Sequence, residues 1–124
     1  MQLKDINISK LKGVALDYAV AKVINKPAVG VILDYKKEVK CCVNFDKLSQ
    51  YIYSPSTRWS QCGRLIDHFK VELGFDVTEE SEPYYAIYFD EHLSGSSYQE
   101  AVCRAIVNIH GCDGLSIPDE LLKN

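Results

Sequence analysis

The sequence lacks the features that mark membrane and exported proteins. No stretch approaches the roughly eighteen consecutive apolar residues that a bilayer-spanning helix needs. Residues 1–5 have neither the basic start nor the apolar run of a secretory signal. We therefore expect a cytoplasmic protein with no membrane partner.

An excess of basic charge is also missing. The chain carries 14 basic and 17 acidic residues, which gives a formal net charge of -3. This balance argues against a protein that follows the phosphates of duplex nucleic acid with a broad basic surface. A small anionic ligand stays open, because two or three well-placed cations suffice to bind it.

Spacings typical of metal sites and disulfide frameworks are absent as well. The five cysteines contain no Cys-x-x-Cys pair, and the three histidines contain no His-x-x-x-His pair. An odd number of cysteines without paired spacing fits neither a disulfide framework nor a zinc knuckle. We expect no metal and no cofactor.

What the chain has is the composition of one globular domain. It contains 124 residues, of which 47% are hydrophobic and 25% charged, with no repeat or linker. Apolar residues at i, i+3, i+4 and i+7 predict helices over 13–25 and 60–68, and a third that follows the Ser/Gly turn at 94–96 and ends at Gly111. We expect a single-domain α+β fold over residues 1–124, with helices packed on a small, mostly antiparallel sheet.

The strands are expected from β-branched and aromatic runs. Residues 29–34 and 38–43 read as a hairpin, and two further strands are expected within 70–77 and 84–89. Residues 44–53 are ambiguous and suit a helical turn or two. We also expect Ser60 to cap the second helix, Gly74 to mark a bulge, and residues 90–92 to form a solvated loop.

Residues 54–64 form the most informative stretch, because they combine several groups that bind nucleotides at the start of a helix. Unpaired N–H groups at a helix N-terminus attract anions. Guanidinium groups grip phosphate oxygens, and an indole ring stacks on a base. The candidate ligand-binding residues here are Ser56, Thr57, Arg58, Trp59, Gln61 and Arg64.

Each of these residues also has a simpler interpretation. The single tryptophan of a small domain is most often core, and serines before a helix are most often caps. Two further candidates lie on other helices. Tyr18 stands away from the apolar stripe of its helix, where it serves a secondary contact, a subunit interface or a ligand. Arg104 shares a stripe with Glu100 on the outer flank of its helix, away from the buried face, which suggests either an i, i+4 ion pair or a third cation in the pocket.

Enzyme chemistry finds little support. The chain has no Gly-x-Ser-x-Gly elbow, no P-loop and no His-Glu-x-x-His helix. Asp90, Glu91 and His92 make its only dense acid–base cluster, and a cysteine activated by a distant histidine stays open. We expect no enzymatic activity and assign no catalytic residue.

Four short motifs in order resemble the small phage NinX-like proteins. They are the run at 9–22, the Tyr-Ser-Pro-Ser-Thr-Arg-Trp run from 53 to 66, the Glu-Ala-x-x-Arg pattern ending at Arg104, and the Ile-Pro-Asp-Glu-Leu run at 117–121. The resemblance covers nearly the whole chain. It implies an α/β/α-type sandwich encoded by a phage or prophage.

The resemblance also implies a function. Small phage proteins of this architecture, the Thoeris anti-defence sponges, bind cyclic ADP-ribose isomers without degrading them, and some sequester the cyclic oligonucleotides of CBASS immunity. By this resemblance the arginines would bind phosphates, the aromatic residues adenine, and the hydroxyl and amide groups ribose. A homo-oligomer in the host bacterial cytoplasm is expected. The alternative is a phage accessory protein that acts by binding another protein.

Overall fold

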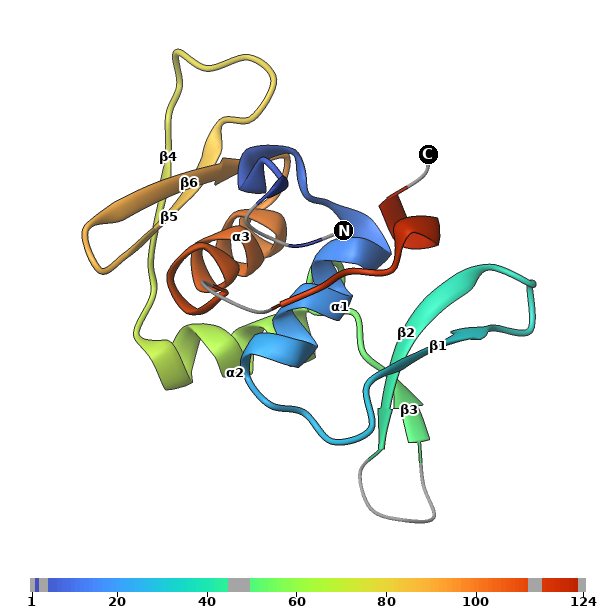
Figure 1. The fold of residues 1–124 in the computed structure, drawn as a ribbon. Coiled ribbons are helices and arrows are strands. Elements are labelled where there is room, and N and C mark those ends of the chain that lie inside the picture. The colour runs from blue at the N-terminus through green and yellow to red at the C-terminus, as the bar shows by residue number, and fades with distance from the viewer. Residues whose placement is uncertain (1, 3–4, 45–49, 112–114, 123–124) are drawn as a thin grey trace.

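The computed structural model describes residues 2, 5–44, 50–111 and 115–122 of the chain. Three helices lie between two small antiparallel sheets (Figure 1). The helices are α1 (Gly13–Val23), α2 (Trp59–Phe69) and α3 (Tyr98–His110), and the short 3-10 turns are η2 (Ile8–Lys10) and η3 (Asp119–Leu122). The expected α+β class is confirmed.

The first sheet has the order β1-β2-β3, with β1 (Gly30–Leu33), β2 (Val39–Asn44) and β3 (Gln50–Ile52). The expected hairpin is therefore present, and Leu33 pairs with Val39 next to its turn. Cys41 and Val43 of β2 are buried, because α1 packs against this strand. The part of the hairpin nearest its turn extends away from the helices (Figure 1).

The second sheet has the order β4-β5-β6, with β4 (Glu72–Phe75), β5 (Tyr84–Tyr88) and β6 (Glu91–Gly95). Helix α3 covers β5 and β6 and also contacts α1 and α2. Contacts with both a sheet and two helices explain why seven consecutive residues of α3 are buried, namely Ala101, Val102, Cys103, Arg104, Ala105, Ile106 and Val107.

Several local expectations are wrong. Residues 50–52 form a strand and not a helical turn, whereas 45–49 lie outside the described residues. Residues 91 and 92 belong to β6 and not to a solvated loop. The cap of α2 is Arg58, so Ser60 already lies within the helix.

Gly74 also has a different role from the expected one. Its register with Tyr85 is continuous, so there is no bulge. A side chain at this position would meet the Tyr85 ring, which lies against the Gly74 backbone. Glycine here lets the Tyr85 ring lie across the strand, and a larger residue would displace that ring.

Arg104 is the main correction to the site expected from the sequence. Its side chain is 2% exposed, so it does not lie on an outer flank of α3. Nε donates to the Leu11 carbonyl at 2.8 Å, and Nη1 donates to the Ser94 carbonyl at 2.9 Å. Two carboxylates complete the set, with Glu82 2.9 Å from Nη1 and Glu100 3.1 Å from Nη2. The expected i, i+4 pair with Glu100 is confirmed, but the guanidinium has no room for a ligand.

In the part of the chain that the structure describes, no helix is long and apolar enough to cross a membrane.

Removing the Arg104 side chain should destabilise the whole fold. Arg104→Ala removes the cation that pairs with Glu82 and Glu100 and the donor to two carbonyl groups, and breaking a buried pair in this way costs about 3–5 kcal/mol. We expect urea denaturation to show a fall of this size in the free energy of unfolding. Arg58→Ala is the control, because Arg58 is exposed and should change this value by less than about 0.5 kcal/mol. A loss below about 1 kcal/mol for Arg104→Ala would contradict the structural role.

Candidate functional site

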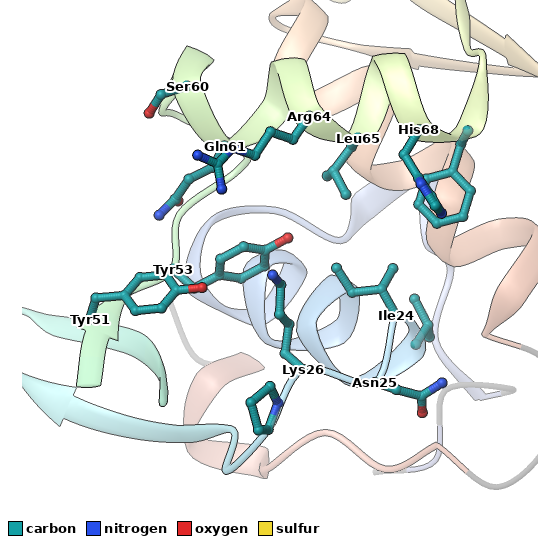
Figure 2. A pocket seen from close by; sticks show the side chains of 13 residues that line it. Ile24, Asn25, Lys26, Tyr51, Tyr53, Ser60, Gln61, Arg64, Leu65 and His68 are labelled. Atoms are coloured by element: carbon teal, nitrogen blue, oxygen red, sulfur yellow. The ribbon is translucent and has the colours of Figure 1, made fainter. Parts of the chain in front are cut away.

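A cavity of about 900 Å³ lies between the end of α1, strand β3 and one side of α2 (Figure 2). Cavities of roughly 300–1,000 Å³ accommodate small organic ligands. Its lining combines basic, aromatic, amide and aliphatic side chains, and consists of Val23, Ile24, Asn25, Lys26, Pro27, Tyr51, Tyr53, Ser60, Gln61, Arg64, Leu65, His68 and Phe69.

The end of α1 makes one wall. Asn25 adopts a left-handed backbone with φ 62, and the N–H of Lys26 donates to the Ala21 carbonyl at 2.9 Å. This is the Schellman arrangement, in which asparagine is one of the few residues that accept the left-handed position without much strain. The chain therefore turns sharply and brings Lys26 beside β3, with its Nζ 5.5 Å from the centre of the Tyr53 ring.

Strand β3 and the residue after it supply two tyrosines. Tyr51 and Tyr53 are two positions apart, so they extend from the same side of the chain into the cavity (Figure 2). Tyr53 is buried, and this burial raises the pKa of its hydroxyl group above the ordinary value. The Tyr53 hydroxyl is therefore a neutral hydrogen-bonding group at physiological pH.

Helix α2 makes the facing wall. Arg64 is exposed and extends along the helix towards Gln61 (Figure 2). Leu65 lies one helical turn after Gln61, and His68 lies one helical turn after Arg64. Phe69 closes this end, with its ring 4.7 Å from that of His68. The cavity is thus basic and polar near Arg64 and Lys26, and apolar near Leu65 and Phe69.

Charge distinguishes this cavity from a second hollow in the structure. Lys26 and Arg64 are in its lining, and none of the described lining residues is an aspartate or a glutamate. A second hollow of about 630 Å³ beside β5 and β6 has the opposite character, because Asp76, Glu79 and Glu82 line it. An acidic protein therefore has a local site whose charged lining residues, Lys26 and Arg64, are both positive.

Gln61 joins two of the walls. Its Oε1 accepts from the backbone N–H of Ser54 at 2.6 Å, and its Nε2 donates to the Ile52 carbonyl at 2.9 Å. Both ends of the amide are therefore occupied by backbone. Gln61 fixes α2 against the end of β3 and is a positioning residue.

The candidates from residues 54–64 fall into three groups. Gln61 and Arg64 line the cavity. Thr57, Arg58 and Trp59 are exposed and lie outside the lining. Trp59 is 53% exposed, so the alternative interpretation of a core tryptophan is wrong. Ser56 is buried and belongs to the scaffold.

Tyr18 does not line the cavity either. It is half-buried against the core, with Lys22 Nζ 6.0 Å above its ring. Lys26, Tyr51, Tyr53 and His68, by contrast, line the cavity and were missed from the sequence. The sequence pattern that could have indicated the two tyrosines is the period-two spacing of Tyr51 and Tyr53, because a strand places such residues on the same face of its sheet.

A buried carboxylate supports the loop that leads into α2. Asp17 of α1 is 4% exposed and accepts from the backbone N–H of Ser56 at 2.9 Å. Burial raises the pKa of Asp17 from 3.8 to about 6, although the Ser56 hydrogen bond and the charge of Lys40 oppose the shift. This contact ties the loop at 54–58 to α1 and hence holds both walls of the cavity in place.

The stability of the protein should therefore fall as Asp17 ionises. Between pH 3.8 and about 6 the folded state binds more protons than the unfolded state at this group, so the free energy of unfolding decreases as pH rises. A shift of this size corresponds to about 3 kcal/mol. We expect urea denaturation to show that the free energy of unfolding of Asp17→Asn, relative to that of the unmodified protein, increases by about this amount between pH 3.5 and pH 7.5.

Asp67→Asn is the matched control, because the Asp67 side chain is 87% exposed and should not alter the pH dependence. A difference between Asp17→Asn and the unmodified protein that stays constant over this pH range would contradict the assignment.

The fold and the cavity describe a small α+β protein with a basic, aromatic pocket, and the comparisons place it among phage proteins. The family model described as Bacteriophage P22, NinX matches residues 7–108. The chain belongs to this NinX family. No curated protein matches it.

Proposed function

We propose that this phage protein binds a cyclic nucleotide immune signal of the host and sequesters it without cleaving it. The observation that carries the proposal is the cavity, in which Lys26 and Arg64 accompany two tyrosines and no described carboxylate. Such a lining suits a ligand that has phosphate groups, hydroxyl groups and a flat ring. Cyclic ADP-ribose isomers of the Thoeris type have all three, as do the cyclic oligonucleotides of CBASS.

The polarity of the cavity suggests how the ligand lies. Phosphate oxygens pair with the Arg64 guanidinium and the Lys26 ammonium group. The tyrosine hydroxyls are suited to ribose. The base then lies at the apolar end near Leu65 and Phe69, where its face meets aliphatic and aromatic surface.

Binding without chemistry is supported by the state of the cysteines that the structure describes. Cys41, Cys42, Cys62 and Cys103 are all buried. Burial raises the pKa of Cys62 to about 12, so its nucleophilic thiolate is scarce at neutral pH. Among the described residues no cluster of His, Cys, Asp and Glu is suited to holding a metal ion. A sequestering protein of this kind would act in the bacterial cytoplasm, where its ligand is made.

Direct titration tests the proposal. Calorimetry with cyclic ADP-ribose isomers, cyclic dinucleotides and cyclic trinucleotides should reveal binding of at least one of them. After heat denaturation of the complex, chromatography and mass spectrometry should recover that ligand unchanged. No binding across the panel would contradict the proposed function, and a chemically altered ligand would show an enzyme.

Variants of the two cations test the site itself. Arg64→Ala and Lys26→Ala each remove a hydrogen bond to a charged group worth about 1.5–3 kcal/mol, so the dissociation constant should rise about tenfold to a hundredfold. Arg58→Ala is the matched control, because Arg58 is a nearby arginine outside the lining. Equal losses in all three variants, or none in the first two, would place the ligand elsewhere.

The second candidate is an accessory protein that acts by binding another protein. Trp59 favours it, since this large side chain is 53% exposed beside Arg58 at the start of α2 and outside the cavity. Tryptophan and arginine are enriched among the residues that dominate protein interfaces. Indifference to every nucleotide, together with a partner whose binding Trp59→Ala abolishes, would favour this alternative.

A further inference from the structure

We propose that strand β1 pairs with the β1 strand of a second copy, so that two chains form a dimer with one continuous six-stranded sheet. This inference does not depend on the proposed function. It rests on the backbone register of the first sheet, on the exposed side chains of β1, and on the absence of charged residues and proline from this strand.

The register shows which backbone groups of β1 face outwards. The N–H of Asp34 donates to the Glu38 carbonyl at 2.9 Å, so this pair is hydrogen-bonded. Hydrogen-bonded pairs alternate along an antiparallel ladder. Ile32 and Gly30 therefore bond to β2, whereas the N–H and C=O groups of Val31 and Leu33 face away from it.

The same alternation is visible on the other side of β2. The Tyr53 N–H donates to the Cys41 carbonyl at 2.9 Å, so Cys41 bonds towards β3. Cys41 stands opposite Val31 in the register, and its bonds point away from β1. Within the described residues no ladder partner covers the outer edge of β1, which is the end strand of its sheet.

The outward groups are arranged for pairing with an identical strand. Val31 and Leu33 lie symmetrically about Ile32, so a twofold axis at Ile32 places Val31 of one copy opposite Leu33 of the other. Each N–H then meets a carbonyl group, and all outward groups of these two residues are satisfied. A self-complementary contact of this kind closes as a dimer and does not propagate into a fibre.

The side chains on this edge favour the same partner. Val31 is 38% exposed, Leu33 63% and Val39 44%, and Leu33 stands opposite Val39. In the twofold arrangement the Val31 and Leu33 side chains of the two copies become cross-strand neighbours. The apolar face that α1 covers at Cys41 and Val43 would continue across the dimer.

The outer strands β4 and β6 of the second sheet carry charged residues, which discourage pairing, and β1 carries none. Charged residues, proline and short length protect edge strands. Glu72 lies in β4, Glu91 lies in β6, and β3 has only three residues. The four residues of β1 include neither a charge nor a proline.

The test is the molar mass of the full chain, measured by sedimentation equilibrium over a concentration series. We expect a reversible dimer with twice the mass of the single chain. Val31→Pro removes only an outward N–H and keeps the ladder with β2, and Leu33→Lys adds a charge to the edge. Both should raise the dimer dissociation constant at least about tenfold.

Leu73→Lys is the control, because Leu73 is 41% exposed on β4 and should leave the dimer intact. Thermal melting of each variant checks that it folds, and Leu33→Lys alone suffices if proline disturbs the strand. A single-chain mass up to millimolar concentration would overturn the proposal. So would a dimer that persists unchanged in both β1 variants.

Discussion

The buried guanidinium of Arg104 is the interaction on which the arrangement of the chain depends. It bonds to the Leu11 carbonyl before α1, to the Ser94 carbonyl in β6, to Glu82 before β5 and to Glu100 within α3. A buried cation is tolerated only when its donors are satisfied. These four segments must therefore adopt their positions together, and α3 is fixed between the β4–β6 sheet and α1.

The cavity follows from this frame by a short chain of contacts. Helix α1, once placed, presents Asp17 to Ser56 and thereby fixes the loop before α2. Gln61 then fastens α2 to the end of β3. The cavity lies between the end of α1, strand β3 and α2, and Lys26, Tyr53 and Arg64 face it (Figure 2). Polar contacts within the scaffold thus build the site, and these three side chains are left to bind a ligand.

Much of the fold could be predicted from the sequence because it depends on local pattern. The apolar stripes of α1, α2 and α3 and the hairpin of β1 and β2 were found where the structure has them. Strand β3 was missed because apolar residues at helical spacing competed with the period-two signal of Tyr51 and Tyr53. The apolar stripe of α3 predicts the helix correctly. It does not show that the flanks of the helix are also covered by α1, α2 and the second sheet, so the sequence predicts Arg104 on an outer flank.

The candidate site was predicted only in part, for a related reason. The residue types at the start of α2 indicate a binding site. Which of these residues share a cavity depends on the direction in which each side chain extends from the helix. Arg64 and Gln61 face β3, whereas Arg58 and Trp59 do not. Lys26 could not be found, because its place depends on the left-handed turn at Asn25 and on packing between segments distant in the sequence.

NMR mapping of amide and side-chain chemical shifts tests most directly whether the cavity binds a cyclic nucleotide. Cyclic ADP-ribose is the first titrant, and the cyclic oligonucleotides follow. We predict that the largest changes occur on three segments that meet at the cavity, at Lys26, Tyr51, Tyr53, Arg64 and His68. Changes centred on the acidic hollow near Glu79 and His92, or none with any of these ligands, would contradict it.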